Sequence, residues 1–361
     1  MCAGAETGER ILDFCMRPWR AWTRSGCDYV IVPYLSYGTA DLLFLKGRVL
    51  RERQASQGPG FWANAVASYR RITSLEVPHA TVRAKCGDAQ VETRSDEEGF
   101  FSCELKNPTA SGFWQTVEFE LLEPKSAQAV RTSGRTVVPQ SNCGFGVISD
   151  IDDTIVMSHA TNPLRVAKTV LLQGACQRIA FPGVAAFYRT LSFHSNAERN
   201  PIFYVSSAPW NIYDLTLDIL ELNKIPLGPI LLQDYGWDRR KFFCASHAEH
   251  KTLQIQRIMA TYPELSFVLI GDSGQQDAEI YSAVLEQTPN RVRAVYIRDV
   301  SQNARDEEVR TLASRAAAHG GQLLLVRDSL EAATHAAGLG LITQEDLATV
   351  DAEFRTGGAA V

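Results

Sequence analysis

Two stretches of the chain differ in how their hydrophobic and polar positions alternate. From residue 28 to about residue 142, short apolar runs with alternating polar positions are separated by turn residues, a pattern typical of antiparallel strands. These runs cover residues 29–32, 42–45, 47–50, 80–84, 90–93, 100–105 and 117–121. We expect a small all-β sandwich over residues 28–142, with a last edge strand and a linker in residues 124–142.

From residue 144 onward, apolar runs of strand length alternate with stretches of helix length. The expected strands are residues 146–149, 202–206, 229–232, 267–271, 294–298 and 322–326. The expected helices are residues 183–192, 210–222, 250–261, 277–287, 307–318 and 330–337. This alternation predicts an α/β fold for residues 143–361, with a doubly wound, mainly parallel sheet. In such sheets the ligand crevice lies at the carboxyl ends of the strands, so polar residues there are the first candidates for function.

The first 27 residues form a separate segment with a helical pattern. Residues 9–24 carry apolar and aromatic side chains among four arginines, and Pro18 interrupts them. Such a segment can lie in a membrane interface or pack on its own domain, and its short, broken helix favours packing. No apolar run has the length of a membrane span, and the N-terminus lacks the pattern of a signal peptide. We therefore expect a cytoplasmic protein.

The composition narrows the class of protein. The 361 residues are 45% hydrophobic, which allows a substantial core, and the formal net charge is −5. We expect no nucleic-acid partner, because general polyanion binders usually carry a basic domain or stripe. The eight cysteines include no C-x-x-C pair, so we expect thiols rather than a zinc site. Cys86 and Cys103 lie on neighbouring expected strands, and a disulfide between them is the alternative.

Three carboxylates follow the expected strand 146–149 within four positions, at Asp150, Asp152 and Asp153. Crowded like charges are costly unless a cation or a phosphoryl group neutralises them. Because side chains alternate along an extended chain, Asp150 and Asp152 can point into the same crevice. One carboxylate can then attack phosphorus while its partner moves protons. The alternative, an acidic loop that caps a helix, needs only one aspartate.

The next candidates are a hydroxyl and a cation. Ser206 and Ser207 end the strand 202–206, just ahead of a helix whose N-terminus favours an anion. Ser206 is preferred because it directly follows the apolar run, and an ordinary helix cap is the alternative. Lys251 opens a helical run that leads into the strand 267–271, which directs its charge towards the crevice. A lone lysine is otherwise usually solvated.

The last element is a second acidic pair. Asp272 follows the strand 267–271, and Asp277 begins the next helix. Magnesium takes oxygen ligands in an octahedron and keeps water and substrate phosphate in its shell. The carboxylates of Asp150 and Asp272 and the carbonyl of Asp152 are suitable ligands. Asp277 is open to three interpretations, as a ligand, as a partner of a metal-bound water or as a helix cap.

Taken in order, these residues resemble the four motifs of the haloacid dehalogenase-like phosphatases, which are an aspartate pair, a hydroxyl, a lysine and an acidic pair. Within that superfamily, residues 149–154, 206–210 and 271–277 look like the phosphatidate phosphatases first described from yeast cortical actin patches. The similarity covers about residues 145–298. Residues 93–101 resemble the T-x-x-D-x-x-G-x-F hairpin of transthyretin-like and immunoglobulin-like modules, and a similar β-module precedes the catalytic domain in bacterial members.

The resemblance implies a haloacid dehalogenase-like (Rossmannoid) sheet and a role for each residue in its DxDxT and later motifs. It makes Asp150 the nucleophile and Asp152 the general acid and base, and it gives Asp153 no role. The implied phosphate-binding residues are Ser206, Ser207, Lys251 and Thr154, and the implied magnesium ligands are Asp150, Asp152, Asp272 and Asp277. The short segment 155–178 leaves room for a minimal cap only, and an open crevice suits a large or membrane-held substrate.

The leading hypothesis is therefore a Mg²⁺-dependent phosphatidate phosphatase that forms diacylglycerol and phosphate through an aspartyl-phosphate intermediate. It implies a phospholipid substrate and peripheral contact with a membrane. One alternative is a phosphatase of the same fold that acts on a soluble phosphate ester, a nucleic-acid end or a phosphoprotein. The other is a non-catalytic lipid or protein adaptor, against which the complete set of acidic, hydroxyl and lysine groups argues.

Overall fold

The computed structural model describes residues 29–51, 75–108, 112–156, 180–194, 198–233, 247–301, 305–318 and 320–358. The chain divides into two compact units, with the main boundary between Thr136 and Val137. Each unit is described by itself. The expected N-terminal helical segment, residues 1–27, lies outside the described residues, as does most of the expected minimal cap.

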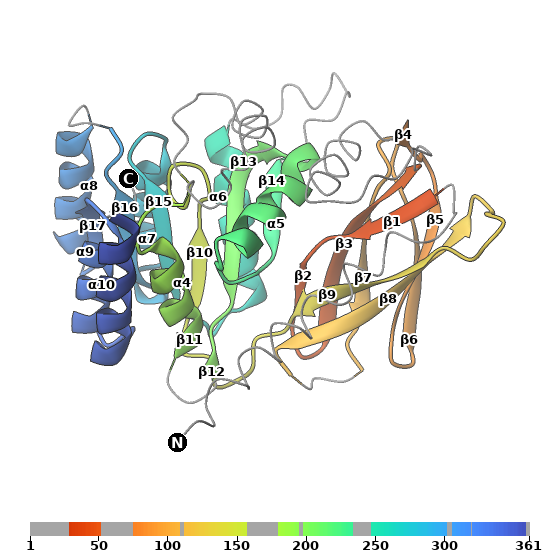
Figure 1. Ribbon diagram of the computed structural model, residues 1–361, viewed down its shortest axis with the longest axis horizontal. Coiled ribbons are helices and arrows are strands. Elements are labelled where there is room, and N and C mark those ends of the chain that lie inside the picture. The colour runs from red at the N-terminus through yellow and green to blue at the C-terminus, as the bar shows by residue number, and fades with distance from the viewer. Residues whose placement is uncertain are drawn as a thin grey trace. The chain divides into compact units, whose positions relative to one another are not determined.

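The described elements of the first unit are strands (Figure 1). They are β1 (Tyr29–Pro33), β2 (Ser36–Gly38), β3 (Leu42–Arg51), β4 (Leu75–Glu76), β5 (Thr81–Cys86), β6 (Ala89–Arg94), β7 (Phe100–Lys106), β8 (Trp114–Glu123) and β9 (Arg131–Val137). Residues 42–45 and 47–50, expected as two strands, form the single strand β3. Cys86 and Cys103 are free thiols, as the thiol prediction requires, and burial raises the pKa of both.

These strands form one nine-stranded sheet, so the predicted sandwich of two sheets is not confirmed. The main order is β1-β3-β2-β9-β8-β5-β6, and β4 and β7 also pair with β3. The long strand β3 explains the difference, because it pairs with β1 and β2 and also with β7. Gly47 lets β3 lie close to the Phe101 ring of β7, since a Cβ at Gly47 would lie 2.5 Å from that ring. The predicted edge position of the last strand is wrong, because β9 lies between β2 and β8.

The second unit alternates strands and helices, as predicted from residue 144 onward. Its strands are β10 (Gly146–Ser149), β11 (Phe193–His194), β12 (Glu198–Arg199), β13 (Ile202–Pro209), β14 (Ile230–Gln233), β15 (Phe267–Asp272), β16 (Val292–Arg298) and β17 (Leu323–Val326). Its helices are α4 (Val184–Ser192), α5 (Tyr213–Leu222), α6 (His247–Thr261), α7 (Asp277–Gln287), α8 (Asp306–Ala318), α9 (Ser329–Gly338) and α10 (Gln344–Gly358), with 3₁₀ turns η3 (Trp210–Ile212) and η5 (Pro289–Arg291).

Six of these strands form a parallel sheet in the order β14-β13-β10-β15-β16-β17. Helices α4, α9 and α10 pack together, and α6, α7 and α8 form a second group, so the sheet lies between two helical layers (Figure 1). All residues of the central strands β10 and β15 are buried, which explains their continuous apolar sequences.

The winding of this sheet reverses beside β10. From β10 the chain moves outward to β13 and β14, and it then returns past β10 to add β15, β16 and β17. A reversal of this kind opens a crevice at the carboxyl ends of the two strands that flank it. Asp150 directly follows β10, and Asp272 is the last residue of β15. The fold therefore brings these two carboxylates to the same crevice.

Candidate active site

The turn after β10 begins with Asp150. Its backbone N–H donates to the carbonyl of Ile270 in β15 at 2.9 Å, so the ladder continues one residue past the strand. The carbonyl of Ile151 then accepts from the N–H groups of Ile155 and Val156, at 3.0 and 3.4 Å. Asp153 within this turn has a φ of +54°, which residues other than glycine rarely adopt. The backbone that carries Asp150 and Asp152 is therefore tightly folded.

Lys251 lies between two carboxylates. Its Nζ donates to Asp150 Oδ1 at 2.8 Å and to Asp277 Oδ1 at 2.5 Å, and all three side chains are almost fully buried. Burial alone would lower the pKa of Lys251, but these two carboxylates raise it above its usual value. The lysine therefore remains charged and holds one oxygen of Asp150 in a fixed position.

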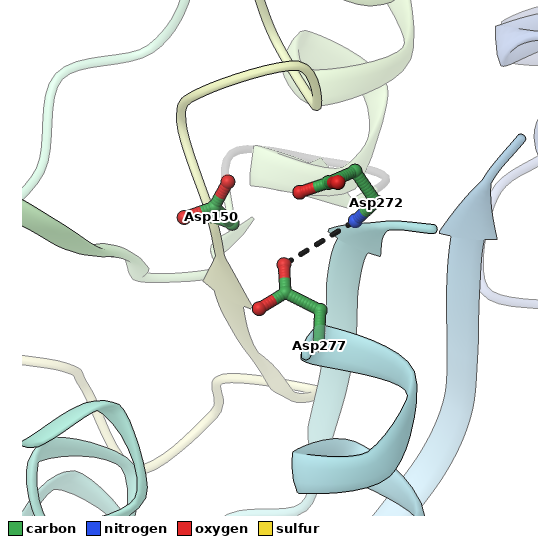
Figure 2. Close-up of side chains that lie close together, drawn as sticks. All are labelled: Asp150, Asp272 and Asp277. Carbon is green, nitrogen blue, oxygen red and sulfur yellow. Dashed lines mark hydrogen bonds between the residues drawn. The ribbon is translucent and has the colours of Figure 1, made fainter. Parts of the chain in front are cut away.

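Figure 2 shows Asp150, Asp272 and Asp277 side by side. Oxygens from the three side chains lie within 4.8 Å of one another. Asp272 Oδ1 accepts from the N–H groups of Gly274 and Gln275, at 2.7 and 3.0 Å. The backbone N–H of Asp272 donates to Asp277 Oδ2 at 3.3 Å. Gly271 is required here, since a Cβ would lie 2.4 Å from that same oxygen.

The cluster of Asp150, Asp272, Asp277 and Lys251, which we call the acidic cluster, has more negative than positive charge. Burial, followed by the charges of Asp277 and Asp272, raises the pKa of Asp150, although Lys251 opposes this shift. Burial and Asp277 likewise raise the pKa of Asp272 to about 7. Asp272 Oδ2 is buried and accepts no hydrogen bond within the described part of the chain. A buried set of carboxylate oxygens with one open acceptor fits Mg²⁺, which prefers oxygen ligands.

Asp152 is oriented by Ser206. The Ser206 hydroxyl donates to Asp152 Oδ2 at 3.2 Å and accepts from the N–H of Ala208 at 3.0 Å. Burial raises the pKa of Asp152, and the hydrogen bond from Ser206 lowers it. The two side chains therefore form one unit beside the acidic cluster.

An irregular end of β13 positions Ser206. The pairing of β13 with β14 shifts register between Val205 and Pro209, and the 3₁₀ turn η3 comes before α5. Ser206 and the half-buried Ser207 thus lie within the strand, which continues to Pro209 rather than ending at Ser206 as the sequence predicted. The predicted helical stretch over residues 210–222 is confirmed, with the 3₁₀ turn η3 followed directly by α5.

Thr154 connects the turn to an arginine that the sequence analysis missed. Its hydroxyl donates to Asp150 Oδ2 at 3.4 Å, and its carbonyl accepts from Arg298 Nε at 3.1 Å. Arg298 ends β16, so its position at the carboxyl end of a predicted strand was a usable signal. A second missed pair is Ser149 and Tyr188, whose hydroxyls lie 2.6 Å apart, with Ser149 donating to the Asp150 carbonyl.

The comparisons with known proteins include a family match to the same part of the chain. A model of the family described as phosphatidate phosphatase APP1, catalytic domain, matches residues 145–299. Phosphatidate phosphatase APP1 of Saccharomyces cerevisiae is 35% identical over 171 residues, which are 46% of this chain and 28% of the yeast protein. An uncharacterized protein of Schizosaccharomyces pombe is 26% identical over 217 residues, which are 59% of this chain and 35% of that protein.

Among solved structures, a carbohydrate acetylesterase from Xanthomonas citri matches 82% of this chain and 69% of its own at 9% identity. Its TM-score of 0.30 is too low to indicate a common fold. The chain spans about a third of the length of the two fungal proteins. The match to the family covers the whole acidic cluster with Asp152, Thr154 and Ser206. Residues 145–299 are therefore similar to the family described as phosphatidate phosphatase APP1, catalytic domain.

Proposed function

We propose that this protein is a Mg²⁺-dependent phosphatidate phosphatase, a phosphoric monoester hydrolase. The observation that carries the proposal is the acidic cluster at the winding reversal of the sheet, within the segment that matches the family. Phosphoryl transfer needs a positive charge near the phosphate and a negatively charged group that can attack or hold a metal ion. Lys251, held by two buried carboxylates, provides the first, and the carboxylates, one of which has an open oxygen, provide the second.

Asp150 is the proposed nucleophile. Lys251 fixes its Oδ1, and Thr154 contacts its Oδ2, so the carboxylate has a defined orientation. In the first step a carboxylate oxygen forms a bond to phosphorus, and the bond from phosphorus to the lipid oxygen breaks. Such covalent catalysis divides one difficult hydrolysis into two easier steps.

Asp152 is the proposed general acid and base. Its raised pKa favours a protonated carboxyl that can protonate the departing lipid oxygen. In the second step the Asp152 carboxylate removes a proton from water, which attacks phosphorus, releases phosphate and restores Asp150. Ser206 holds Asp152 for both steps, and the Ser206, Ser207 and Lys251 groups are the proposed contacts to the phosphoryl oxygens.

Asp150 and Asp272 would hold Mg²⁺ through their carboxylates, and Asp152 through its carbonyl. The bound ion would supply positive charge to the phosphoryl oxygens. Both oxygens of Asp277 already accept hydrogen bonds, from Lys251 and from the Asp272 N–H. This favours the interpretation in which Asp277 positions Lys251 and Asp272 rather than binding the ion directly.

The finer features of the fold and the setting are part of the same proposal. We infer a haloacid dehalogenase-like sheet for the second unit and an immunoglobulin- or transthyretin-like origin for the first. We also infer a cytoplasmic protein that meets phosphatidate at a membrane surface. None of the helices in the described ranges is both long and apolar enough to cross a bilayer.

The test measures phosphate release from phosphatidate in mixed micelles and from soluble phosphate esters, with Mg²⁺ and with a chelator. We expect Mg²⁺-dependent release that is faster with phosphatidate. Asp150→Asn should lower kcat by at least about 10³-fold, because amides are poor nucleophiles. Asp153→Asn is the matched control, since asparagine tolerates a left-handed backbone, and it should retain most of the activity. Faster turnover of a soluble ester would contradict the proposal that phosphatidate is the substrate. An active Asp150→Asn protein would contradict the proposal that Asp150 is the nucleophile.

A further inference from the structure

Arg298 is a buried arginine at the carboxyl end of β16. It is 8% exposed and lies opposite Asp272 in the pairing of β15 with β16. Burial lowers its pKa to about 10, so the guanidinium still carries its charge at neutral pH. No carboxylate of the described residues forms an ion pair with it. A buried charge without such a partner is costly, so its other contacts need an explanation.

Three groups of the described residues contact the guanidinium. Its Nε donates to the carbonyl of Thr154 at 3.1 Å, and its Nη2 donates to the hydroxyl of Ser329 at 2.8 Å. Its central carbon lies 4.3 Å from the centroid of the Phe181 ring, which is a favourable cation–π distance. Ser329, at the start of α9, is fully buried. Arg298 is therefore anchored on α9 and directed towards the turn after β10.

Thr154 links Arg298 to Asp150. Its carbonyl is held by Arg298, and its hydroxyl is directed at Asp150 Oδ2. The preceding residue, Asp153, has a left-handed backbone, which is strained in residues other than glycine. A conformation of this kind persists only where its surroundings fix it. The hydrogen bond from Arg298 is such a constraint, directly after the strained residue.

Phe181 provides a second contact at the same place. Its backbone N–H donates to the carbonyl of Ile155 at 3.1 Å, and Val156 forms an antiparallel bridge with Ala180. The guanidinium thus contacts the turn directly, at Thr154. It also contacts Phe181, whose segment is hydrogen-bonded to the same turn. Both contacts restrain residues that immediately follow Asp150 and Asp152.

We propose that Arg298 is a positioning residue for phosphoryl transfer, which fixes Thr154 and Phe181 and thereby the placement of Asp150 and Asp152. This inference rests on the proposed function. The geometry requires arginine, because one planar group makes two hydrogen bonds and lies over a ring at the same time. A lysine keeps the charge but cannot make this set of contacts.

The test compares Arg298→Lys with Arg291→Lys, because Arg291 ends the 3₁₀ turn η5 directly before the same strand. Arg291 donates to the carbonyls of Met259, Tyr262 and Leu265, so it is also an arginine that holds backbone groups. For each full-length variant we would measure thermal unfolding, kcat and KM with phosphatidate, and the hydrogen exchange of a peptide that covers residues 150–156. Ser329→Ala is a milder second variant, which removes one acceptor and leaves the guanidinium.

We expect Arg298→Lys to lower kcat by about 10- to 100-fold with KM nearly unchanged, since small misplacements of reacting groups have effects of this size. Exchange of the Ile155 and Val156 amides should become about tenfold faster. Ser329→Ala should change both quantities in the same direction by about threefold. Arg291→Lys should lower the unfolding temperature and leave kcat and the exchange of residues 150–156 unchanged.

Two results would overturn the inference. One is a kcat within twofold of wild type in Arg298→Lys, and the other is an unchanged exchange of residues 150–156 in both Arg298→Lys and Ser329→Ala. If the wild-type protein releases no phosphate from any substrate, the proposed function is wrong instead. The hydrogen exchange of residues 150–156 then shows by itself whether Arg298 anchors the turn after β10.

Discussion

At the scale of single residues, the acidic cluster places charge where it costs stability. Asp150, Asp272 and Asp277 are buried close to one another, and Lys251 is the one lysine of the described residues that is paired with them. Proteins accept such strain at functional sites, and it is relieved when the ligand binds. The cluster therefore makes a prediction about stability as well as about activity.

Asp272→Asn should stabilise the metal-free protein and abolish turnover. The folded pKa of Asp272 is raised to about 7, so folding favours its protonated form. The free energy of unfolding therefore falls as the pH rises from about 4 through about 7, and the substitution removes this loss. Asparagine keeps the oxygen that accepts from Gly274 and Gln275. We expect a gain of about 1–2 kcal/mol at pH 8 and little at pH 5 in urea unfolding. A less stable variant at pH 8 would show that the cluster is not strained.

At the scale of elements, the proposed catalytic and metal-binding carboxylates lie at the carboxyl ends of strands. The strand β10 and the helix α7 have the predicted bounds, because a continuous apolar run and an acidic helix start are strong local signals. The contacts between Lys251, Asp277 and Asp150 join three elements far apart in sequence, so only the fold defines them.

The helix α10 was not predicted. Its mean hydropathy is low, so its sequence carries only a weak apolar signal. Tertiary contacts hold it instead, because Val350 is fully buried and Phe354 packs where Gly183 lacks a side chain. Arg189 of α4 also pairs with Glu353. Local sequence patterns cannot reveal a helix that is stabilised mainly by its neighbours.

Ser206→Ala tests the irregular end of β13. Loss of its hydroxyl removes the hydrogen bond that lowers the pKa of Asp152, so that pKa should rise. We expect kcat to fall by about tenfold and the limb of the pH–rate profile that reports Asp152 to move to higher pH. Ser206→Thr keeps a hydroxyl and is the matched control. A uniform loss of activity with an unchanged profile would contradict this role of Ser206.

At the scale of the whole molecule, the elements of the proposed site all belong to the second unit. Binding of an ion to the folded state only should stabilise that unit by mass action. With Mg²⁺ at 100 times its dissociation constant we expect about 2.7 kcal/mol of additional stability. Thermal unfolding of the wild-type protein and of Asp272→Asn, with and without Mg²⁺, measures this gain. Equal stabilisation of both proteins would place the ion elsewhere.

The central claim is that Asp150 attacks the phosphorus of phosphatidate. Its most direct test is to mix the protein and Mg²⁺ with phosphatidate labelled in the phosphate, quench with acid within one turnover, and locate the label by peptide mapping. We predict label on Asp150 in a bond that hydroxylamine cleaves, and none in Asp150→Asn. Release of phosphate without any labelled protein, or label on a different residue, would contradict the account.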